Sequence, residues 1–429
     1  MKAVNVGVKV SSCVSRLALT AALSLAAGAS VQAEPKTNLL HQWSTGGDAL
    51  AIAKLGEMFE AEGGSWEQTP IAGHTANTLT KLRAEVLAGN PPPAVQLKGP
   101  EIAEWAATGY TTDLNKLAAE ETWDEVVAPT LISVMKPEGE WAAAPMNIHR
   151  INWMWASKPA LDQVGVTELP KTWDEFNQVA EKLDAAGIMP IAHGSMDWTD
   201  GTLFEIVVYG MDPELYRKAF VDLDLDALQS EGMVESFAQL RRMVGWMDEG
   251  IPGRTWDVAA AMMLKGEAGF HFMGDWAIGY FNNNGYTANE DYLCGRAPMN
   301  LDEPGFILNS DSVVFFEVDD PDYQEGQVLL AHLIMSPEFQ TVFNKAKGSI
   351  PARMDVDLEA FNTCQQKAQA DLQTSIEADN LVVSMAHNMA VPQKYRAAML
   401  EVITEFVNDP GVTPEDAAVL LSDAVANEL

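Results

Sequence analysis

Short apolar runs and amphipathic stretches alternate along the chain. Residues 38–41 form a short apolar run that predicts a strand, and a glycine-bearing turn follows it. Apolar side chains then recur at three-to-four spacing between Leu50 and Phe59, which predicts a helix with one buried face. Because helices alternate with short apolar strands, we expect an α/β fold with mostly parallel sheets covered by helices. The same alternation predicts a helix over 81–88, a strand over 94–97 and a helix over 100–108.

A second α/β region begins near residue 141. Residues 141–147 predict a strand that ends in a turn. Thr172 is the expected N-cap of the next helix, because Glu175 stands three positions later and completes the pattern of a capping box. Gly187 is expected to end this helix. Further strands are expected over 189–192, 306–308 and 312–316, and the C-terminal region should be mainly helical, with one helix starting at 336–338.

The length of the chain predicts two domains. It has 429 residues, and single hydrophobic cores stop growing beyond about 250–300 residues. The sequence contains no internal repeat and no flexible linker rich in glycine and serine. We therefore expect two lobes that exchange segments of the chain, rather than two domains joined by a linker.

The amino-terminal segment has the pattern of a removable export signal over residues 1–33. Its start is basic, residues 17–29 are mostly apolar, and small residues precede a cleavage site near Ala33. Cys13 lies before the apolar run, which argues against a lipid anchor at this cysteine. No later segment holds eighteen consecutive apolar residues, so we expect no membrane insertion.

The charge of the chain limits its partners. With 27 basic and 61 acidic side chains, it carries a formal net charge of −34. Such a field repels nucleic acids and anionic membranes, so neither is expected as a partner. Anionic small molecules are disfavoured more weakly, because a local site can override the global field. A receptor for an organophosphate or a polyamine stays open, although only Arg254 stands out as a phosphate ligand.

Motifs of catalysis and metal binding are missing from the sequence. It lacks the Gly-x-Ser-x-Gly elbow, the His-Glu-x-x-His zinc helix and the Gly-x-x-x-x-Gly-Lys phosphate loop. Its seven histidines show no metal-ligand spacing. We therefore expect no catalytic residue, no metal site and no cofactor. A secreted glycoside-processing enzyme remains a distant alternative, because some pair among so many carboxylates always resembles an acid and a base.

Several of the twelve tryptophans stand at unusual places. Trp198 and Trp256, like Trp43 and Trp276, fall in turn-like segments beside carboxylates and amides. An indole face attracts the slightly positive C–H groups of a sugar ring and excludes water. Neighbouring Asp, Asn, Gln, Lys and His side chains supply the donors and acceptors that hydroxyls require. The alternative for each tryptophan is packing in the core.

Two cysteines remain once the signal is removed. Cys294 and Cys364 lie seventy residues apart, which makes them a poor set of metal ligands. In an exported protein an even number of cysteines predicts a disulfide. We therefore expect a Cys294–Cys364 bridge.

A family resemblance runs along essentially the whole chain after residue 33. The sequence resembles the glucose-binding branch of the family 1 extracellular solute-binding proteins, which are bacterial receptors of sugar ABC importers. The likeness is carried, in order, by residues 41–48 (HQWSTGGD), 96–100 (QLKGP), 147–153 (NIHRINW), 190–194 (PIAHG), 253–256 (GRTW), 273–277 (MGDWA), 311–312 (DS), 346–351 (AKGSIP) and 384–387 (SMAH).

The resemblance implies a fold and a function. The fold is that of periplasmic binding proteins, with two α/β lobes, a hinge and a ligand cleft between the lobes. The implied protein is monomeric and periplasmic, captures a monosaccharide such as glucose, and delivers it to the membrane permease of an ABC importer. The approximate lobes are residues 34–146 with 307–365, and residues 147–306 with 366–429.

The resemblance also implies roles for seven residues. Trp43 would stack on the sugar and Trp276 would cover it from the second lobe. Asp48 would accept a hydrogen bond from a hydroxyl. The remaining polar contacts would come from Lys98, Asp311, Lys347 and His387. Cys294 and Cys364 match a cysteine pair of the family.

Structural alternatives exist for four of these seven residues. Lys98, which precedes Gly99 and Pro100, could be merely an exposed turn residue. The sole role of Asp48 could be to cap the helix that follows it, because aspartate is favoured at the N-cap position. The sole role of Asp311 could be to close a turn. His387 could be a core histidine whose hydrogen bonds are satisfied within the protein.

Two positions depart from the family pattern. The family commonly has a second tryptophan where this chain has Gln42, and glutamate where it has Asp48. The loss of one indole and the shortening of one carboxylate change the shape of the pocket. Another sugar epimer or a short glycoside therefore remains an alternative ligand.

Overall fold

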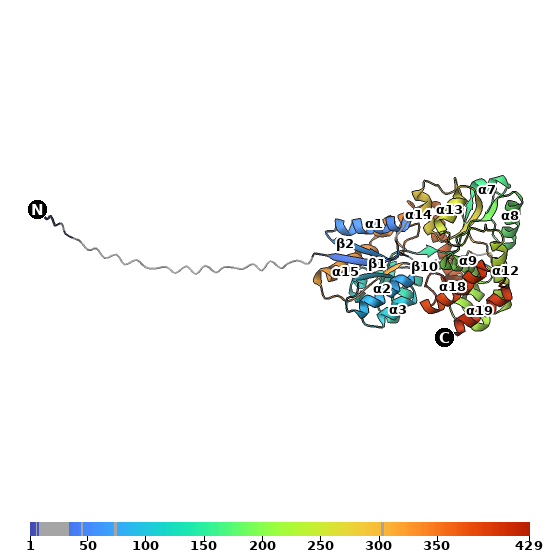
Figure 1. Cartoon of the computed structure of the whole chain (residues 1–429). Coiled ribbons are helices and arrows are strands. Elements are labelled where there is room, and N and C mark those ends of the chain that lie inside the picture. The colour runs from blue at the N-terminus through green and yellow to red at the C-terminus, as the bar shows by residue number, and fades with distance from the viewer. Residues whose placement is uncertain (6, 8–33, 44–45, 73–74, 302–303) are drawn as a thin grey trace. The chain divides into compact units, whose positions relative to one another are not determined.

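The computed structural model describes residues 1–5, 7, 34–43, 46–72, 75–301 and 304–429. Most of the predicted signal sequence, residues 6 and 8–33, lies outside the described residues. Residues 34–429 form a unit separate from residues 1–33 (Figure 1). The description below concerns this larger unit.

The described strands are short. They are β1 (Lys36–His41), β2 (Ser65–Pro70), β3 (Ala94–Leu97), β4 (Ala143–Pro145), β5 (His149–Arg150), β6 (Trp153–Ser157), β7 (Met189–Ile191), β8 (Ala268–Phe272), β9 (Tyr292–Arg296), β10 (Phe306–Asn309), β11 (Ser312–Phe315) and β12 (Leu381–Val383).

Helices make up much of the rest. They are α1 (Gly46–Ala61), α2 (Thr75–Leu87), α3 (Pro100–Ala106), α4 (Asn115–Glu120), α5 (Trp123–Val126), α6 (Pro129–Met135), the 3₁₀ turn η1 (Pro137–Gly139), α7 (Lys158–Gln163), α8 (Trp173–Ala185), α9 (Asp197–Met211), α10 (Pro213–Phe220), α11 (Leu225–Leu228), α12 (Glu231–Val244), α13 (Trp256–Leu264), α14 (Trp276–Asn283), α15 (Pro321–Met335), α16 (Pro337–Lys347), α17 (Thr363–Glu377), α18 (Gln393–Asn408) and α19 (Pro414–Ala426).

Two larger sheets organise the chain. The first has the strand order β2-β1-β3-β11-β4, and the second has the order β7-β8-β6-β9. We call the first sheet with α1, α2, α3, α15 and α16 the first half. The second sheet with α7 to α14, α18 and α19 is the second half. Figure 1 shows the first-half elements on one side and most of the second-half elements on the other, with β10 between them.

The expectation of mostly parallel sheets is wrong. Among the described strands, β1 pairs in parallel with β2 and β3, whereas β11 is antiparallel to both β3 and β4. In the second sheet, β6 is antiparallel to β8 and β9. The strand β11 returns to the first sheet from the second half, more than two hundred residues after β3. Its direction is therefore not set by the local strand–helix alternation.

A small third sheet lies where the chain passes between the halves. Its order is β12-β10-β5, with β10 parallel to β12 and antiparallel to β5. Only residues 146–148 separate β4 of the first sheet from β5. Residues 310–311 likewise separate β10 from β11. Two of the crossings between the halves therefore lie at neighbouring points, and a third follows between α16 and α18.

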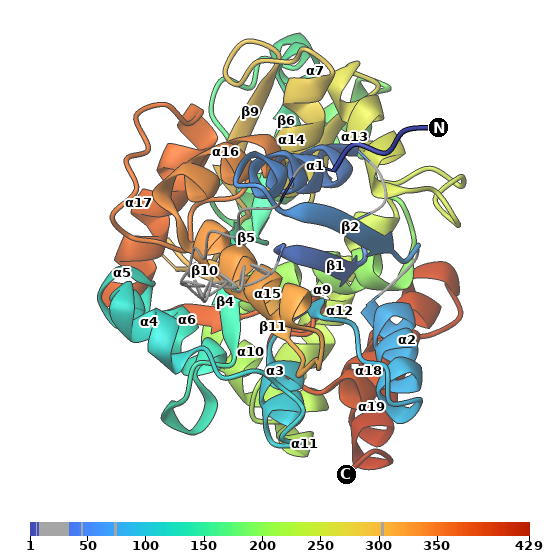
Figure 2. The same ribbon diagram turned by 90° about the vertical axis from the view of Figure 1, so that its left-hand side faces the viewer.

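Helices cover the sheets on both halves. In the first half, α1 packs against α16 and α15 packs against β1, and α1 and α15 face the viewer in Figure 2. In the second half, α9, α12, α18 and α19 pack against one another. The strand β6 is buried along its whole length, and the indole of its Trp155 donates to the Met273 carbonyl oxygen at 2.7 Å.

Local capping rules place several helix ends. Thr172 caps α8 and accepts from the backbone N–H of Glu175, as predicted. The Glu175 carboxylate accepts from the backbone N–H of Lys171 rather than from that of Thr172. Ser336 caps α16 and accepts from the Phe339 N–H at 3.1 Å. This helix ends at Gly348, whose φ of 94° is the left-handed conformation that favours glycine.

Sequence analysis missed the strand β2. It spans Ser65–Pro70, and its residues are exposed or half-buried at the edge of the first sheet. An edge strand with this composition gives no alternating apolar pattern. Its Trp66 packs on Phe59 of α1, with ring centroids 5.8 Å apart.

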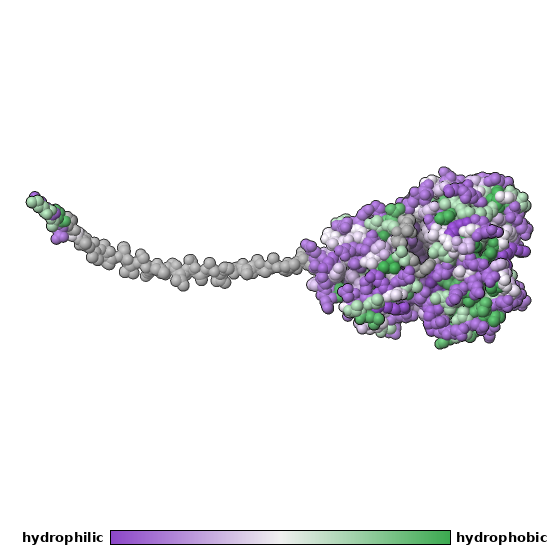
Figure 3. Space-filling model, in the orientation of Figure 1, coloured by the Kyte–Doolittle hydropathy of each residue, from purple (hydrophilic) through white to green (hydrophobic). Residues whose placement is uncertain are grey.

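The surface of the unit matches its charge. Figure 3 shows hydrophilic side chains over most of the visible face, with scattered apolar patches. Among the described residues, no helix combines the length and the apolar character that a membrane crossing needs.

The structure joins Cys294 and Cys364, the predicted pair. Cys294 lies in β9 and Cys364 lies in the first turn of α17, with their Cα atoms 6.0 Å apart. The bridge ties the edge strand of the second sheet to a helix that packs against β10 and β12.

Replacement of both cysteines by alanine should lower the free energy of unfolding. The bridge closes a loop with a sequence separation of 70, and loop-closure entropy for such a length corresponds to about 4 kcal/mol. Urea unfolding of the double variant, beside the oxidised and reduced parent protein, measures this difference. An oxidised parent no more stable than the double variant would contradict the expectation.

Candidate functional site

A cavity of about 170 Å³ is lined by residues of both halves. Its walls combine indole rings with charged and amide side chains. The structure brings together around this cavity all seven residues named from the family resemblance: Trp43, Asp48, Lys98, Trp276, Asp311, Lys347 and His387.

First-half residues reach the cavity from the ends of strands and helices. Trp43 follows β1 and Lys98 follows β3, at the carboxyl edge of these parallel strands. Asp48 lies in the first turn of α1, and Lys347 is the last residue of α16. The carboxyl edge of parallel strands is where α/β proteins commonly bind ligands.

Asp311 is the most heavily bonded carboxylate of the site. It accepts from Lys98 Nζ at 2.7 Å, from Asn147 Nδ2 at 2.8 Å and from Gln96 Nε2 at 3.0 Å. Its other contact is His149 Nε2 at 3.1 Å. Burial alone would raise the pKa of Asp311, but Lys98 and His149 hold it well below its usual range.

His149 connects Asp311 to the second half. Its Nδ1 is paired with Asp275, whose second carboxylate oxygen accepts from the Arg150 backbone N–H at 2.9 Å. Burial would lower the pKa of His149. The negative charges of Asp275 and Asp311, together with the hydrogen bonds that these carboxylates accept, raise this pKa above its usual value. A doubly protonated imidazole can donate to both carboxylates at once. Lys98, Asp311, His149 and Asp275 thus form one buried charged chain.

The aromatic wall of the cavity begins at Trp276. The indole is 8% exposed and lies 5.1 Å from the ring of His387 and 6.1 Å from that of Trp198, measured between centroids. A Cβ at Gly274 would lie 2.2 Å from the Trp276 ring, so only glycine leaves room for the indole to fold back. The glycine before Trp276 therefore determines where the ring lies.

A second ion pair lies beside Trp43. Lys347 Nζ contacts Asp48 Oδ1 and lies 5.2 Å from the centroid of the Trp43 ring. The Lys347 side chain is 4% exposed, whereas that of Asp48 is 31% exposed. Asp48 thus has a partner beyond the first turn of its own helix.

His387 is held by the buried carboxylate of Glu205. Ser384 Oγ donates to Glu205 Oε1 at 2.7 Å and lies 2.9 Å from His387 Nδ1. Because the single hydroxyl proton goes to Glu205, Nδ1 donates to Ser384 and Nε2 carries the lone pair. Burial lowers the pKa of His387, which favours this neutral form. Nε2 has no hydrogen-bond partner among the described residues.

The cavity also contains residues that were not among the seven. Trp198 and Trp256 shared the tryptophan-beside-carboxylate signal but were not selected. Asn388 and Arg396 gave no sequence signal, because an asparagine and an arginine in a helical region are ordinary surface residues. The other additional lining residues are Gln42, Thr75, His149, Asn309 and Ala386.

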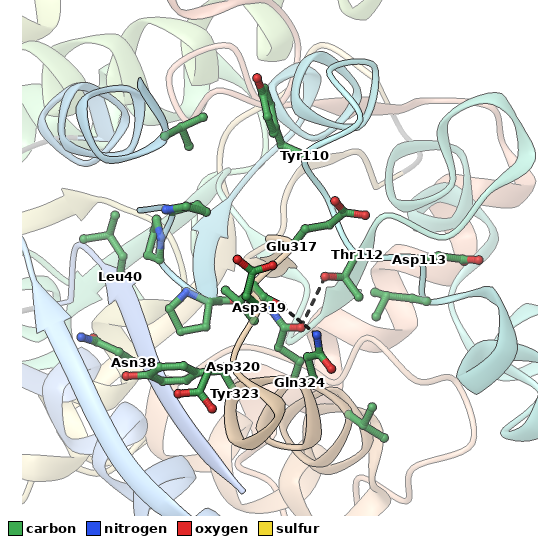
Figure 4. Close-up of a pocket in the computed structure, with 18 of the residues that line it drawn as sticks. Asn38, Leu40, Tyr110, Thr112, Asp113, Glu317, Asp319, Asp320, Tyr323 and Gln324 are labelled. Atoms are coloured by element: carbon green, nitrogen blue, oxygen red, sulfur yellow. Dashed lines mark hydrogen bonds between the residues drawn. The ribbon is translucent and has the colours of Figure 1, made fainter. Parts of the chain in front are cut away.

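A larger cavity, of about 1160 Å³, lies in the first half away from this site. It is lined by residues before β3, by residues between 110 and 120, and by residues after β11 that include Glu317, Asp319 and Asp320 (Figure 4). Thr112 donates to Gln327 Oε1 at 3.4 Å along its wall. Its carboxylates outnumber its single lysine, as expected in so acidic a chain, and none of the seven residues lies there.

Within the described residues, no group of three or more His, Cys, Asp or Glu side chains is arranged to hold a metal ion.

The sequence of the chain is similar to that of known proteins. The sequence model of the family "Bacterial extracellular solute-binding protein" matches residues 54–374. A "probable sugar-binding periplasmic protein" of Brucella suis is 41% identical over 411 residues, which cover 95% of this chain and 96% of the relative. A protein of the same description from Rhizobium meliloti is 40% identical over 406 residues, or 94% and 97% of the two chains.

Solved structures show the same fold. A chitin oligosaccharide binding protein superposes with a TM-score of 0.78 at 20% identity, covering 91% of this chain and 98% of that chain. A bacterial solute receptor described as having an exclusive preference for β-D-galactopyranose superposes with a TM-score of 0.76 at 18% identity, covering 92% and 98%. At these identities the likeness establishes the fold, with its two α/β lobes and interlobe cleft, and not the ligand.

The raised pKa of His149 predicts a pH dependence of stability. A protonated His149 stabilises the folded state fully below pH 6.5, the usual pKa of histidine, and this stabilisation is lost as the pH rises through the raised pKa. The free energy of unfolding of the parent protein should therefore fall above pH 6.5 relative to that of His149→Gln. Urea unfolding of both proteins between pH 6 and 9 measures the difference, and parallel pH curves would show that His149 is not responsible.

Proposed function

This chain belongs to the bacterial extracellular solute-binding proteins, and we propose that it is the periplasmic receptor that captures a monosaccharide for an ABC-type importer. Its relatives and structural neighbours are binding proteins, and the chain is a binding protein rather than an enzyme. The proposal concerns the ligand, the residues that contact it and the delivery to a permease.

One observation carries the proposal. Seven residues spread from position 43 to position 387 line one cavity, which combines indole faces with paired donors and acceptors. This is the chemistry that a sugar requires, because its ring has apolar C–H faces and a polar edge. We propose that Trp43 and Trp276 contact the ring faces. Asp48, Lys98, Asp311, Lys347 and His387 then bind hydroxyls.

The size of the cavity supports a monosaccharide. Pockets for drug-sized ligands measure roughly 300–1,000 Å³, and this cavity measures about 170 Å³. A single sugar ring suits this volume better than a short glycoside does. A short glycoside remains the second candidate, because both halves contribute to the lining and a more open arrangement would enlarge it.

Glucose is the first candidate among the monosaccharides, on the strength of the resemblance. Two first-half contacts bear on the choice of epimer. Gln42 Oε1 accepts from Thr75 Oγ1 at 2.9 Å, so the amide that replaces the family's second tryptophan is already held in place. Asp48 is paired with Lys347. A ligand on this side of the cavity therefore meets the Gln42 amide and the Asp48–Lys347 ion pair, without a second indole.

We propose that the two halves act as the lobes of a hinged receptor. The predicted lobes are residues 34–146 with 307–365, and residues 147–306 with 366–429. The pairing of β10 with β5 and β12 favours a crossing at 310–311, a few residues after the predicted boundary at 306/307. Contacts from both lobes to one sugar stabilise the closed state, which the permease then recognises.

We further propose that the receptor reaches the periplasm through a signal peptide cleaved near Ala33 and works as a monomer. The basic and apolar pattern of residues 1–33 and the naming of the relatives support export.

Glucose or a close epimer should raise the melting temperature of the protein, because a ligand that binds only the folded state stabilises it. A thermal-shift screen of residues 34–429 against D-glucose, D-galactose, D-mannose, D-xylose, maltose and chitobiose tests this. The sugar should remain chemically unchanged after incubation. The absence of any shift across the panel would refute sugar binding, and a shift with the disaccharides alone would replace the monosaccharide by a short glycoside.

Trp276→Ala should weaken sugar binding by about 2–3 kcal/mol, because a buried aromatic anchor against the ligand is lost. Trp66→Ala is the matched control, because Trp66 packs on Phe59 in the first half and does not line the cavity. It should lower the unfolding midpoint and leave the affinity within about two-fold. Titration calorimetry and urea unfolding measure both quantities. An unchanged affinity in folded Trp276→Ala would remove this residue from the binding site.

A further inference from the structure

The polypeptide directly after His387 carries a second buried acceptor without a partner. Asn388 lines the cavity and is 0% exposed. Its Oδ1 makes no hydrogen bond to the described residues. A buried carbonyl oxygen without a partner is unfavourable, and such a group in a native protein calls for an explanation such as a ligand or a water molecule.

The orientation of the Asn388 amide follows from its neighbours. Asn388 Nδ2 donates to Gln393 Oε1 at 2.5 Å and lies 3.5 Å from Glu101 Oε1. Gln393 Oε1 also accepts from Arg396 Nη1 at 3.4 Å. Because a guanidinium only donates, the oxygen end of Gln393 must face it. The nitrogen of Asn388 therefore points to Gln393, and its oxygen is the end left for a donor.

The backbone of Asn388 has a left-handed conformation and lies against the first half. Its φ of 59° is in the left-handed region, which asparagine adopts more readily than most residues. From the first half, Gly99 approaches so closely that a Cβ there would lie 2.1 Å from the Asn388 carbonyl oxygen. Asn388 thus occupies a built position at the contact between the halves, and not a free loop.

We propose that Asn388 is a ligand-binding and specificity-determining residue, whose Oδ1 accepts a hydrogen bond from one hydroxyl of the sugar. With His387 Nε2 it forms a pair of acceptors on consecutive residues, so the ligand must present hydroxyl donors on this side. Gln393 is a positioning residue that holds the amide nitrogen, which leaves the oxygen as the end of the amide without a protein partner. This inference rests on the proposed function and adds a contact that the family resemblance did not supply.

A thermodynamic cycle tests the contact. Titration calorimetry compares parent protein and Asn388→Gly with D-glucose, or with the epimer that binds best in the screen, and with its single-deoxy analogues. Glycine tolerates the positive φ, so this variant removes the side chain without backbone strain. At one analogue the parent should lose about 2- to 12-fold more affinity than the variant does, the range of one neutral hydrogen bond.

Trp66→Ala is the matched control, because Trp66 lies outside the cavity and its replacement leaves the Asn388 side chain unchanged. It should retain the position-specific coupling whatever its overall affinity. Asn388→Ala, which removes the same oxygen at some cost in backbone strain, repeats the cycle if Asn388→Gly does not fold.

The outcomes separate this inference from the proposed function. Coupling at one hydroxyl that is lost in Asn388→Gly and kept in Trp66→Ala supports the assignment. If parent and variant lose the same affinity for every deoxy analogue, the assignment of Asn388 is overturned. The proposal of sugar binding then stands, because the parent protein still binds the sugar. A parent that binds no sugar overturns the proposed function and this inference together.

Discussion

The buried charged chain Lys98–Asp311–His149–Asp275 is the interaction on which the rest of the site depends. A buried charge is costly unless opposite charges and hydrogen bonds compensate it. Here Asp311 alone has four side-chain partners within 3.1 Å. Two of these charged side chains lie where the polypeptide passes between the sheets. His149 directly follows the crossing at residues 146–148, and Asp311 is part of the crossing at residues 310–311. The same side chains that line the cavity therefore also fix the crossing strands, and the site cannot be altered without affecting the junction.

Much of the fold follows from short-range rules in the sequence. Thr172 and Ser336 were identified as helix starts because the N-cap position obeys local chemistry, and the structure shows both caps. The apolar run of β3 sufficed to locate that strand. The polar edge strand β2 gave no comparable signal, and the antiparallel direction of β11 depends on pairing with residues far away in the sequence.

The residues of the candidate site also fall into those that the sequence indicated and those that only the structure revealed. Trp276 and Lys347 were identified because their surroundings match a family pattern. Asn388 and Arg396 became visible only in three dimensions, because their significance lies in burial and in the partners that the fold gives them. A side chain that is ordinary in sequence becomes informative when it is enclosed and one of its polar atoms has no partner. The fold itself is shared with binding proteins described for different sugars, so the fold alone does not identify the ligand.

The position of β11 also governs the order in which the protein can assemble. This strand fills the place between β3 and β4, and Ser312 of β11 donates to the Leu97 carbonyl oxygen across a separation of 215 residues. Until nearly three quarters of the chain has been synthesised, the first sheet lacks one of its inner strands and two of its pairings. Long-range pairing of this kind slows folding. The first sheet therefore cannot close until late in synthesis, and an incompletely folded polypeptide is one that can be threaded across a membrane.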